Sequence, residues 1–329
     1  MKYAGTRVAQ TLIFAVTIVL ALACHGHAQS NYPSRPIQLI VPVPPGGAAD
    51  FIARIIGMKL SDALGQSVVI NNRGGAGGTI ATASVAKADS DGYTLLLNSI
   101  TTHGIGPHLY TSLSYDPVKD LSPVILVAKL PLIMTINANV PVKSVKDVIE
   151  LAKLQPGKLA FASSGNGGAP HLAGELFKKV TGTDLLHVPY RGSGPAVIDV
   201  IAGRVAIMFD AVPSLLPSIL DNKLRPLAAA SSQRNRLLPD IPTFTELGYA
   251  GMDISLWYGV VVPAGTPQPI VQRLNAELAK ILAMPDVRES FAKQATEPAG
   301  GTPEQFEVFM REESARWGAV VKQAGIKPE

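Results

Sequence analysis

Short apolar runs alternate with amphipathic segments along the chain, and glycine-rich turns separate them. The first run, 37–43, leads through such a turn into a segment whose apolar residues between Phe51 and Leu60 recur at helical spacing. Repeated strand, turn and helix in this order indicates an α/β protein. Further strands are expected at 66–71, 93–98, 124–128, 132–137, 158–162, 185–189, 205–209, 224–229 and 257–262.

Two long helices are expected to close the chain. One begins after Pro267 and Pro269, and the other begins at residues 302–305, whose sequence Thr-Pro-Glu-Gln is a capping box with proline at the first helical position. The stretch 131–250 repeats the strand, glycine turn and helix of the opening twice. This pattern predicts two lobes with two crossings between them: 29–130 plus 255–329 form lobe 1, and 131–254 form lobe 2.

The first 28 residues have the pattern of a secretory signal peptide. Lys2 and Arg7 provide the positive start, 11–23 is a short apolar run, and small residues precede a cleavage position after Ala28. Cleavage there removes Cys24, the only cysteine, so we expect an exported periplasmic protein without disulfides or thiolate chemistry. A lipoprotein processing site at the four residues that end in Cys24 is the alternative.

Composition excludes several classes of protein. The chain has 30 Gly and 26 Pro, 47% hydrophobic residues and only 16% charged residues, so it is neither disordered nor a coiled coil. Loss of Lys2 and Arg7 lowers the formal net charge from +4 to +2. Without a basic run, a nucleic-acid partner is not expected.

Four strand-to-helix junctions hold much of the glycine. They cover 44–50, 73–79, 163–171 and 190–195. The start of a helix has unpaired backbone N–H groups and the positive end of the dipole, so it is a natural seat for an anion, and glycine lets a ligand approach closely. For any single turn, the alternative is that glycine only permits a tight connection. No G-x-x-x-x-G-K-[ST] or G-x-G-x-x-G motif completes a nucleotide site.

Seven segments of the chain, in their order and spacing, resemble the tripartite tricarboxylate transporter substrate-binding proteins, the TctC-like Bug family. The resemblance covers essentially all of 32–325 and rests on residues 32–37, 44–50, 72–78, 187–192, 241–248, 257–260 and 263–267. It implies a type II-like periplasmic-binding-protein fold of two lobes, each a mixed sheet flanked by helices. It also implies that the lobes close on a small organic acid and deliver it to subunits of a membrane transporter.

The resemblance assigns the ligand carboxylate to loops of both lobes. The matching positions here are Gly46, Gly47, Ala48, Ala49 and Asp50 in lobe 1, with Gly75, Ala76 and Gly77 as a further wall, and Ser164, Gly165, Asn166 and Gly168 in lobe 2. Mono-, di- and tricarboxylates, including aromatic acids, all stay open as ligands.

Several of these and other side chains also have a structural alternative. Ser164 and Asn166 are suited to donate to a carboxylate or to cap a helix. Asp210, at a strand end, is suited to accept from a ligand or to serve as a cap, whereas Asp50 in the first turn of a helix also offsets the dipole. Arg191 is suited to a second carboxylate or to a solvated surface pair beside Tyr190.

The segment 98–103 follows a strand, so Thr102 and His103 are candidates to line the pocket, although a lone histidine is commonly structural. A hydrolytic triad of Ser164, His171 and Asp210 is the enzyme alternative, but no G-x-S-x-G motif supports it. No metal motif occurs either. We therefore expect a monomeric binding protein without enzyme activity, cofactor or metal. A ligand-sensing adaptor for a membrane sensor kinase is the other alternative.

Overall fold

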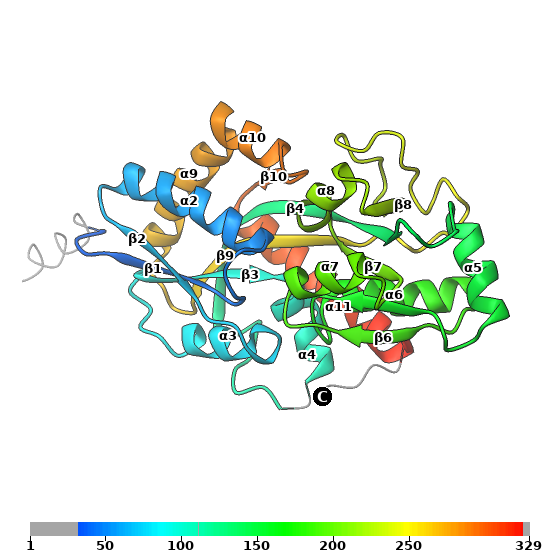
Figure 1. Cartoon of the computed structure of the whole chain (residues 1–329). Coiled ribbons are helices and arrows are strands. Elements are labelled where there is room, and N and C mark those ends of the chain that lie inside the picture. Colours follow the sequence, from blue (N-terminus) through cyan, green and yellow to red (C-terminus); the bar gives the residue numbers. More distant parts are fainter. Residues whose placement is uncertain (1–31, 111, 325–329) are drawn as a thin grey trace, which may run out of the picture. The chain divides into compact units, whose positions relative to one another are not determined.

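The computed structural model describes residues 32–110 and 112–324, so the expected signal peptide lies outside the described residues. By its contacts the chain divides at Pro36, and every helix and strand named below belongs to the unit that begins there. Within it, a mixed sheet has the strand order β2-β1-β3-β9-β4-β7-β5-β6, with β8 and β10 also paired to β4 (Figure 1).

The strands are short except for two long ones at the centre. They are β1 (Ile37–Val41), β2 (Val68–Asn72), β3 (Thr94–Ser99), β4 (Leu121–Asn137), β5 (Ala160–Ser163), β6 (Leu186–Pro189), β7 (Ile207–Ala211), β8 (Leu224–Ala230), β9 (Ser255–Pro263) and β10 (Glu297–Gly300). Parallel pairs join β1 to β2 and β3, and β5 to β6 and β7, while every pairing of β4 and β9 is antiparallel.

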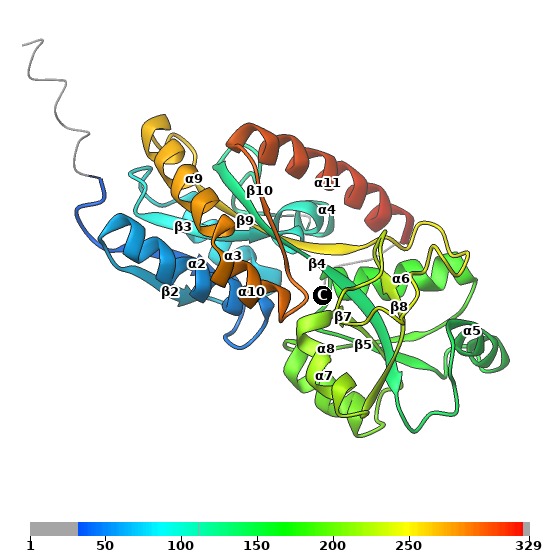
Figure 2. The same cartoon turned by 90° about the horizontal axis from the view of Figure 1, so that it is seen from above.

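Strand β4 joins two sets of strands. Up to Pro131 it pairs with β9 and β10, and from Leu132 onward it pairs with β7 and β8. Proline lacks a ladder donor and is tolerated at irregular points of a sheet, and the register of β4 against β9 shifts next to Pro123. The chain returns through β9, whose first residue Ser255 pairs with Pro131. Figure 2 shows β4 and β9 running side by side through the middle.

The helices cover the outer faces of these strands. They are α2 (Ala48–Leu64), α3 (Thr79–Ala86), α4 (Gly106–Leu109), α5 (Val145–Leu154), α6 (Ala169–Thr181), α7 (Ser193–Ile201), α8 (Val212–Leu220), α9 (Gln268–Ala283), α10 (Pro285–Ala292) and α11 (Pro303–Ala324), with a 3-10 turn η2 (Ala76–Gly78) and a π-helix η3 (Ile100–Ile105). No helix among the described residues is long and apolar enough to span a membrane.

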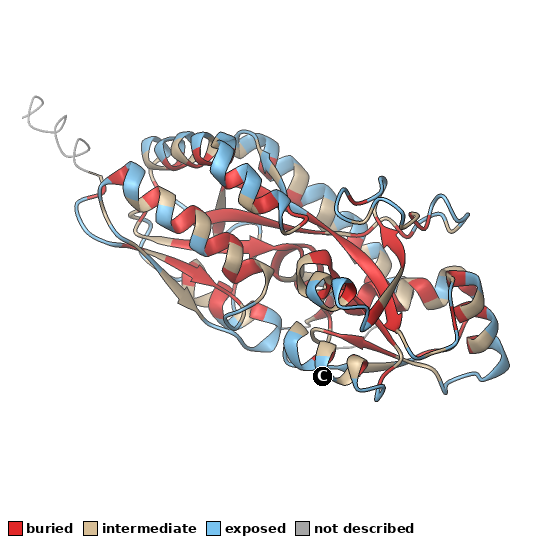
Figure 3. Cartoon of the chain, turned by 45° about the horizontal axis from the view of Figure 1, so that its top comes forward, coloured by how far each residue is buried: buried red, intermediate tan, exposed pale blue. Residues whose placement is uncertain are grey.

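The core lies on both sides of the central strands, which Figure 3 shows as almost wholly buried, while the outer faces of the helices are exposed. Trp257 of β9 and Trp317 of α11 are each 1% exposed, and Phe161, Phe177 and Phe209 fill the side that contains β5 and β7. Burial of side chains of this size is the main favourable term in folding. The core therefore fixes the strand ends from which the glycine turns start.

The element pattern is confirmed in type, with three corrections. The strands expected at 124–128 and 132–137 are one strand, β4, because the exposed Lys129 and the following Pro131 interrupt its apolar pattern without ending it. The closing helices number three among the described residues, since Pro285 starts a separate α10. The edge strand β10 was not expected from its sequence Glu-Pro-Ala-Gly. The lobe boundaries stay a prediction.

Candidate functional site

The first glycine turn joins β1 to α2 and is closed by its own aspartate. Gly47 is the N-cap of α2, and Asp50 Oδ2 accepts hydrogen bonds from the Gly46 amide at 3.1 Å and from Arg54 Nε at 3.0 Å. Burial by itself raises the pKa of Asp50, but the hydrogen bonds from Arg54, Gly46 and Asn72 outweigh it and leave the pKa below its usual value. Asp50 Oδ2 thus has a structural role, since it holds the turn and the first turn of α2 together, and contact of Asp50 with a ligand stays a prediction.

Space is open beside this turn. A Cβ placed on Gly46 or Gly47 would meet no atom within 4 Å. Ala48 is half-buried and Ala49 is buried in the first turn of α2. The amides at the start of α2 have no partner within the helix, as at any helix start. The turn therefore presents free N–H groups next to accessible space, which is what a carboxylate requires.

The second turn lies against the first and against η3. Gly75, Ala76 and Gly77 are exposed around η2. A Cβ on Gly74 would lie 2.9 Å from Pro44 Cδ, and a Cβ on Gly78 would lie 2.7 Å from Thr102 Cγ2. The structure therefore brings the turns 44–50 and 73–79 together with η3, and the role of Gly75, Ala76 and Gly77 as a further wall of the ligand site stays a prediction.

Thr102 and His103 are more enclosed than a ligand contact would suggest. Thr102 is 1% exposed and its hydroxyl donates to Asn98 Oδ1 at 2.7 Å, while it also takes part in a capping box with Ser99. His103 is 4% exposed and lies edge-on to Trp257, with ring centroids 6.4 Å apart. Burial lowers the pKa of His103 to about 4, so the ring is neutral at pH 7. Their role toward a ligand stays a prediction.

The third turn joins β5 to α6, and Gly168 is the N-cap of α6. Ser164, Gly165, Asn166 and Gly168 are all half-buried. The Gly192 amide donates to the Ser164 carbonyl at 3.1 Å, which joins this turn to the fourth turn before α7. A Cβ on Gly167 would lie 2.0 Å from Leu109 Cδ2 of α4. The turn therefore contacts an element that belongs to the expected lobe 1.

Asp210 lies near the end of β7 and is 2% exposed. Its Oδ1 accepts a hydrogen bond from the Ala211 amide at 2.7 Å. Its Oδ2 is buried and accepts no hydrogen bond from another described residue. Burial raises the pKa of Asp210 to about 6, against the opposing influence of the Ser193 hydroxyl and the Ala211 amide. Burial and the nearby Asp210 carboxylate also raise the pKa of Tyr258.

Ser193 and Tyr258 are therefore neighbours of Asp210 that the sequence did not single out as a group. Ser193 opens α7 and Tyr258 lies in β9, where it pairs with Ser99 of β3. The two residues come from elements far apart in the sequence, so no local pattern marks them. The position of Asp210 at a strand end, by contrast, was readable from the apolar run before it.

Arg191 is exposed and makes no hydrogen bond or ion pair with any other described residue. The neighbouring Tyr190 donates its hydroxyl to Asp199 Oδ2 at 2.8 Å. The guanidinium of Arg191 is thus available, and its role toward a second carboxylate stays a prediction.

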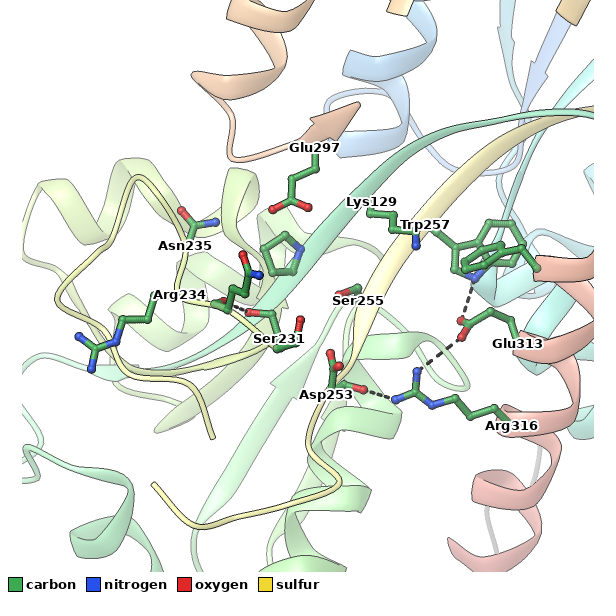
Figure 4. Close-up of a pocket in the computed structure, with 14 residues that line it drawn as sticks. Lys129, Ser231, Arg234, Asn235, Asp253, Ser255, Trp257, Glu297, Glu313 and Arg316 are labelled. Atoms are coloured by element: carbon green, nitrogen blue, oxygen red, sulfur yellow. Dashed lines mark hydrogen bonds and ion pairs between the residues drawn. The ribbon is translucent and has the colours of Figure 1, made fainter. Parts of the chain in front are cut away.

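A cavity of about 410 Å³ lies at the point where β4 and β9 pass between the two sets of strands (Figure 4). It is lined by Lys129, Pro131, Ser231, Ser232, Gln233, Arg234, Asn235, Asp253, Ser255, Trp257, Glu297, Phe309, Glu313 and Arg316. None of the sixteen ligand-binding residues expected from the sequence is among them. The glycine turns and this cavity are two different places on the fold.

Glu313 anchors α11 to the wall of this cavity. Its Oε2 accepts from the indole Nε1 of both Trp257 and Trp317 at 3.0 Å. Its Oε1 lies 3.5 Å from Arg316 Nη1, and Figure 4 shows this ion pair together with the bond to Trp257. Arg316 in turn donates to the Asp253 carbonyl. These bonds connect α11 to β9 and to the segment before it, so they stabilise one wall of the cavity beside β4 and β9.

Removal of this acceptor is expected to destabilise the fold. Glu313→Ala leaves the indole N–H groups of two buried tryptophans unpaired, and each such group costs about 1–3 kcal/mol, so we expect a loss of about 3 kcal/mol in the free energy of unfolding. Urea unfolding followed by tryptophan fluorescence measures it. Glu313→Gln keeps a carbonyl acceptor and should lose about 1 kcal/mol. Equal losses for the two variants would contradict the role of the indole bonds.

The geometry also tests the hydrolytic alternative. His171 Nδ1 accepts from the Gly167 amide at 3.0 Å and its Nε2 faces Glu175 Oε1 at 3.8 Å, so neither ring nitrogen pairs with Ser164. Ser163 and His187 do meet, with Oγ 2.7 Å from Nε2, but the Ser163 hydroxyl donates to the Gly165 carbonyl and is fully buried. In this arrangement His187 acts as the donor, which is the opposite of a general base.

Three histidines with lowered pKa make stability depend on pH: His103 and His171 are buried, and His187 is half-buried. Burial lowers the pKa of His103 and His187 to about 4, and burial together with His187 and Lys178 lowers the pKa of His171 to about 3. Below the ordinary value of about 6.5 the unfolded chain binds protons that the fold does not. Each histidine therefore lowers the free energy of unfolding by about 1.4 kcal/mol per pH unit as the pH falls from about 6.5 toward the pKa of the ring in the folded protein.

Asp210 acts in the opposite direction, because its raised pKa lets the fold hold a proton between about pH 4 and pH 6 that the unfolded chain releases. One such group does not offset three histidines. We expect a lower urea midpoint at pH 5 than at pH 7, with urea titrations at the two pH values as the measurement. A midpoint that is equal or higher at pH 5 would contradict the neutral state of the three rings in the folded protein.

The mixed sheet shared through β4, with its flanking helices and turns, defines an α/β periplasmic-binding-protein fold. Residues 52–326 match the family model described as "Tripartite tricarboxylate transporter family receptor". The chain belongs to this family, whose members include the Bug proteins. Protein BugT of Bordetella pertussis is 42% identical over 298 residues, which cover 90% of this chain and 91% of BugT.

Two solved structures with bound carboxylates are similar to the chain. Rpa4515 of R. palustris with adipate has a TM-score of 0.87 and 38% identity, and covers 91% of this chain and all of its own. MatC (Rpa3494) of Rhodopseudomonas palustris with bound malate has a TM-score of 0.83 and 32% identity, and covers 88% of this chain and all of its own. The chain is thus a periplasmic solute-binding protein of the TctC and Bug type.

Proposed function

We propose that this protein captures a small dicarboxylate between two lobes, 29–130 plus 255–329 and 131–254, and delivers it to a tripartite tricarboxylate-type membrane transporter. The observation that carries the proposal is the accessible helix start at Gly47, where free amides adjoin open space. Adipate and malate in the two similar structures support a dicarboxylate as the ligand class. The protein itself is proposed to bind without catalysis and as a monomer.

Backbone amides carry the recognition in this proposal. The starts of α2 and α6 provide N–H groups and positive dipole ends, so a carboxylate is stabilised without a cluster of lysines and arginines. Arg191 is available for a second carboxylate. Asp210, with one buried oxygen that lacks a partner, is suited to accept from a ligand hydroxyl or a bridging water.

Closure of the lobes follows from the same contacts. β4 and β9 connect the two sets of strands, so bending of these strands changes the distance between the turns of lobe 1 and those of lobe 2. An acid that gains amides from both lobes only when they approach binds the closed state more tightly and shifts the population toward it. The closed state is then what a membrane partner recognises.

A thermal-shift panel on the chain without residues 1–28 tests the ligand class. Adipate, malate, citrate, acetate and benzoate are compared, and a ligand at 100 times its dissociation constant stabilises by about 2.7 kcal/mol. We expect adipate or malate to raise the melting temperature, and adipamide, which has the same chain without charge, to leave it unchanged. An unchanged melting temperature with every acid contradicts the proposal.

Delivery to a transporter needs its own experiment. A strain that lacks this protein is expected to lose uptake of the radiolabelled acid that stabilises the protein most. Uptake should return with the natural chain and not with Gly47→Val, which is expected to block the carboxylate seat. Normal uptake in the deletion strain would separate ligand binding from transport and would favour the sensor alternative.

A further inference from the structure

Two histidine rings lie stacked beneath the turn 164–168. His171 of α6 and His187 of β6 have ring centroids 3.7 Å apart and an interplanar angle of 7°. Phe161 of β5 lies on the same stack, 4.9 Å from His187 between centroids. The parallel register pairs Phe161 with His187, which is how residues from three elements reach one stack.

Each histidine holds one glycine of the turn. The Gly167 amide donates to His171 Nδ1 at 3.0 Å. His187 Nε2 lies 2.7 Å from Ser163 Oγ, and this hydroxyl donates to the Gly165 carbonyl at 3.0 Å. Because Ser163 has one proton to donate, His187 must supply the hydrogen in the bond between them. Both neutral rings therefore carry their proton on Nε2.

The backbone of the turn depends on these bonds. Gly167 has φ +69°, a left-handed conformation that glycine adopts readily, and a Cβ there would strike Leu109. The amides of Gly165 and Gly167 point inward, to Ser163 Oγ at 3.4 Å and to His171. The alternate amides of Asn166 and Gly168 have no hydrogen bond to another described residue. The inward bonds thus decide which amides are left for a ligand.

We propose that His171, His187 and Ser163 are positioning residues that orient the amides of Asn166 and Gly168 toward the carboxylate. This inference rests on the function proposed above, and it adds that the Gly165 and Gly167 amides are excluded from ligand contact. The rings act through the turn and do not touch the ligand. Both must be neutral, since a proton on His171 Nδ1 removes the acceptor that holds the Gly167 amide.

Matched substitutions separate positioning from packing. Asparagine places a carbonyl oxygen near the position of Nδ1, so His171→Asn keeps the acceptor, whereas His171→Leu keeps apolar volume and loses it. Glutamine places an N–H near Nε2, so His187→Gln keeps the donor that His187→Leu loses. Ser163→Ala is the mildest change, because it removes one hydroxyl and leaves both rings in place.

The experiment measures adipate and malate affinity by calorimetry and hydrogen exchange of the Gly167 amide in all five variants. We expect about a tenfold or larger loss of affinity in His171→Leu, His187→Leu and Ser163→Ala. Affinity in His171→Asn and His187→Gln should stay within about threefold of the natural chain. In binding free energy, a threefold change is about half of a tenfold change. Protection of the Gly167 amide should be lost in His171→Leu and kept in His171→Asn.

The positioning role is overturned if Ser163→Ala and His171→Leu bind the acids with natural affinity. It is also overturned if the Gly167 amide stays protected from exchange in His171→Leu. Nitrogen-15 spectra of the natural chain provide a second test, because they report which ring nitrogen of His171 and His187 carries the proton. A proton on Nδ1 of either ring at pH 7 would also overturn the positioning role. If the natural chain binds neither acid, the proposed ligand class fails, while the exchange and tautomer results still decide whether the rings hold the turn.

Discussion

Gly47→Val is expected to weaken dicarboxylate binding about a hundredfold, which corresponds to about 2.7 kcal/mol of binding free energy. The valine side chain would enter the open space beside the start of α2, where the carboxylate must approach the free amides. The fold itself should tolerate the change. Gly47 has φ −97° and ψ −178°, which is extended backbone that valine adopts readily, and no atom lies within 4 Å of its Cβ.

Calorimetry with adipate or malate measures this effect, and urea unfolding checks that stability changes by no more than about 1 kcal/mol, the usual effect of a substitution at a helix N-cap. Ala319→Val also introduces a valine, at an exposed position of α11, and serves as the control. Unchanged affinity in Gly47→Val, with natural affinity in the control, would mean that the start of α2 does not receive the acid.

Gly174→Ala is expected to lower the free energy of unfolding by about 3 kcal/mol, the upper part of the range for overpacked cores. A Cβ at this buried position of α6 would lie 2.1 Å from Phe161 Cε2 and 2.4 Å from its Cζ. Alanine favours a helix over glycine by about 1 kcal/mol, but this gain is smaller than the cost of moving a fully buried phenylalanine.

Gly194→Ala makes the same substitution in α7, where a Cβ meets no atom within 4 Å, so stability should be unchanged or slightly higher. Urea unfolding of both variants gives the comparison. Because Phe161 also stacks on His187, Gly174→Ala should disturb the third turn as well. Equal stability of the two variants would contradict the packing of α6 on Phe161.

Local patterns in the sequence predicted most of the elements that position the site. The glycine turns were readable because strand, glycine and helix follow one another directly, and α2, α6 and α7 each have a glycine N-cap. The capping box at the start of α11 is also confirmed: the Thr302 amide donates to Gln305 Oε1 at 2.9 Å, and the Gln305 amide donates to Thr302 Oγ1 at 3.3 Å.

Long-range pairing accounts for what the sequence did not predict. The stack of His171 on His187 depends on the parallel register of β5 and β6, which neither segment encodes by itself. Strand β10 exists because it pairs with β4, not because Glu-Pro-Ala-Gly favours a strand. The cavity at the crossing likewise gathers residues from β4, β9, β10, α11 and the loop after β8, so no contiguous motif marks it.

In the function proposed above, backbone amides of both lobes hold the same carboxylate ligand. The most direct measurement is a titration of the nitrogen-15-labelled chain, without residues 1–28, with adipate or malate, followed through the amide signals of Gly47, Ala48, Asn166 and Gly168. All four signals are expected to shift together with one dissociation constant. Shifts confined to one lobe, or gathered around Lys129 and Glu297 at the crossing cavity, would contradict it.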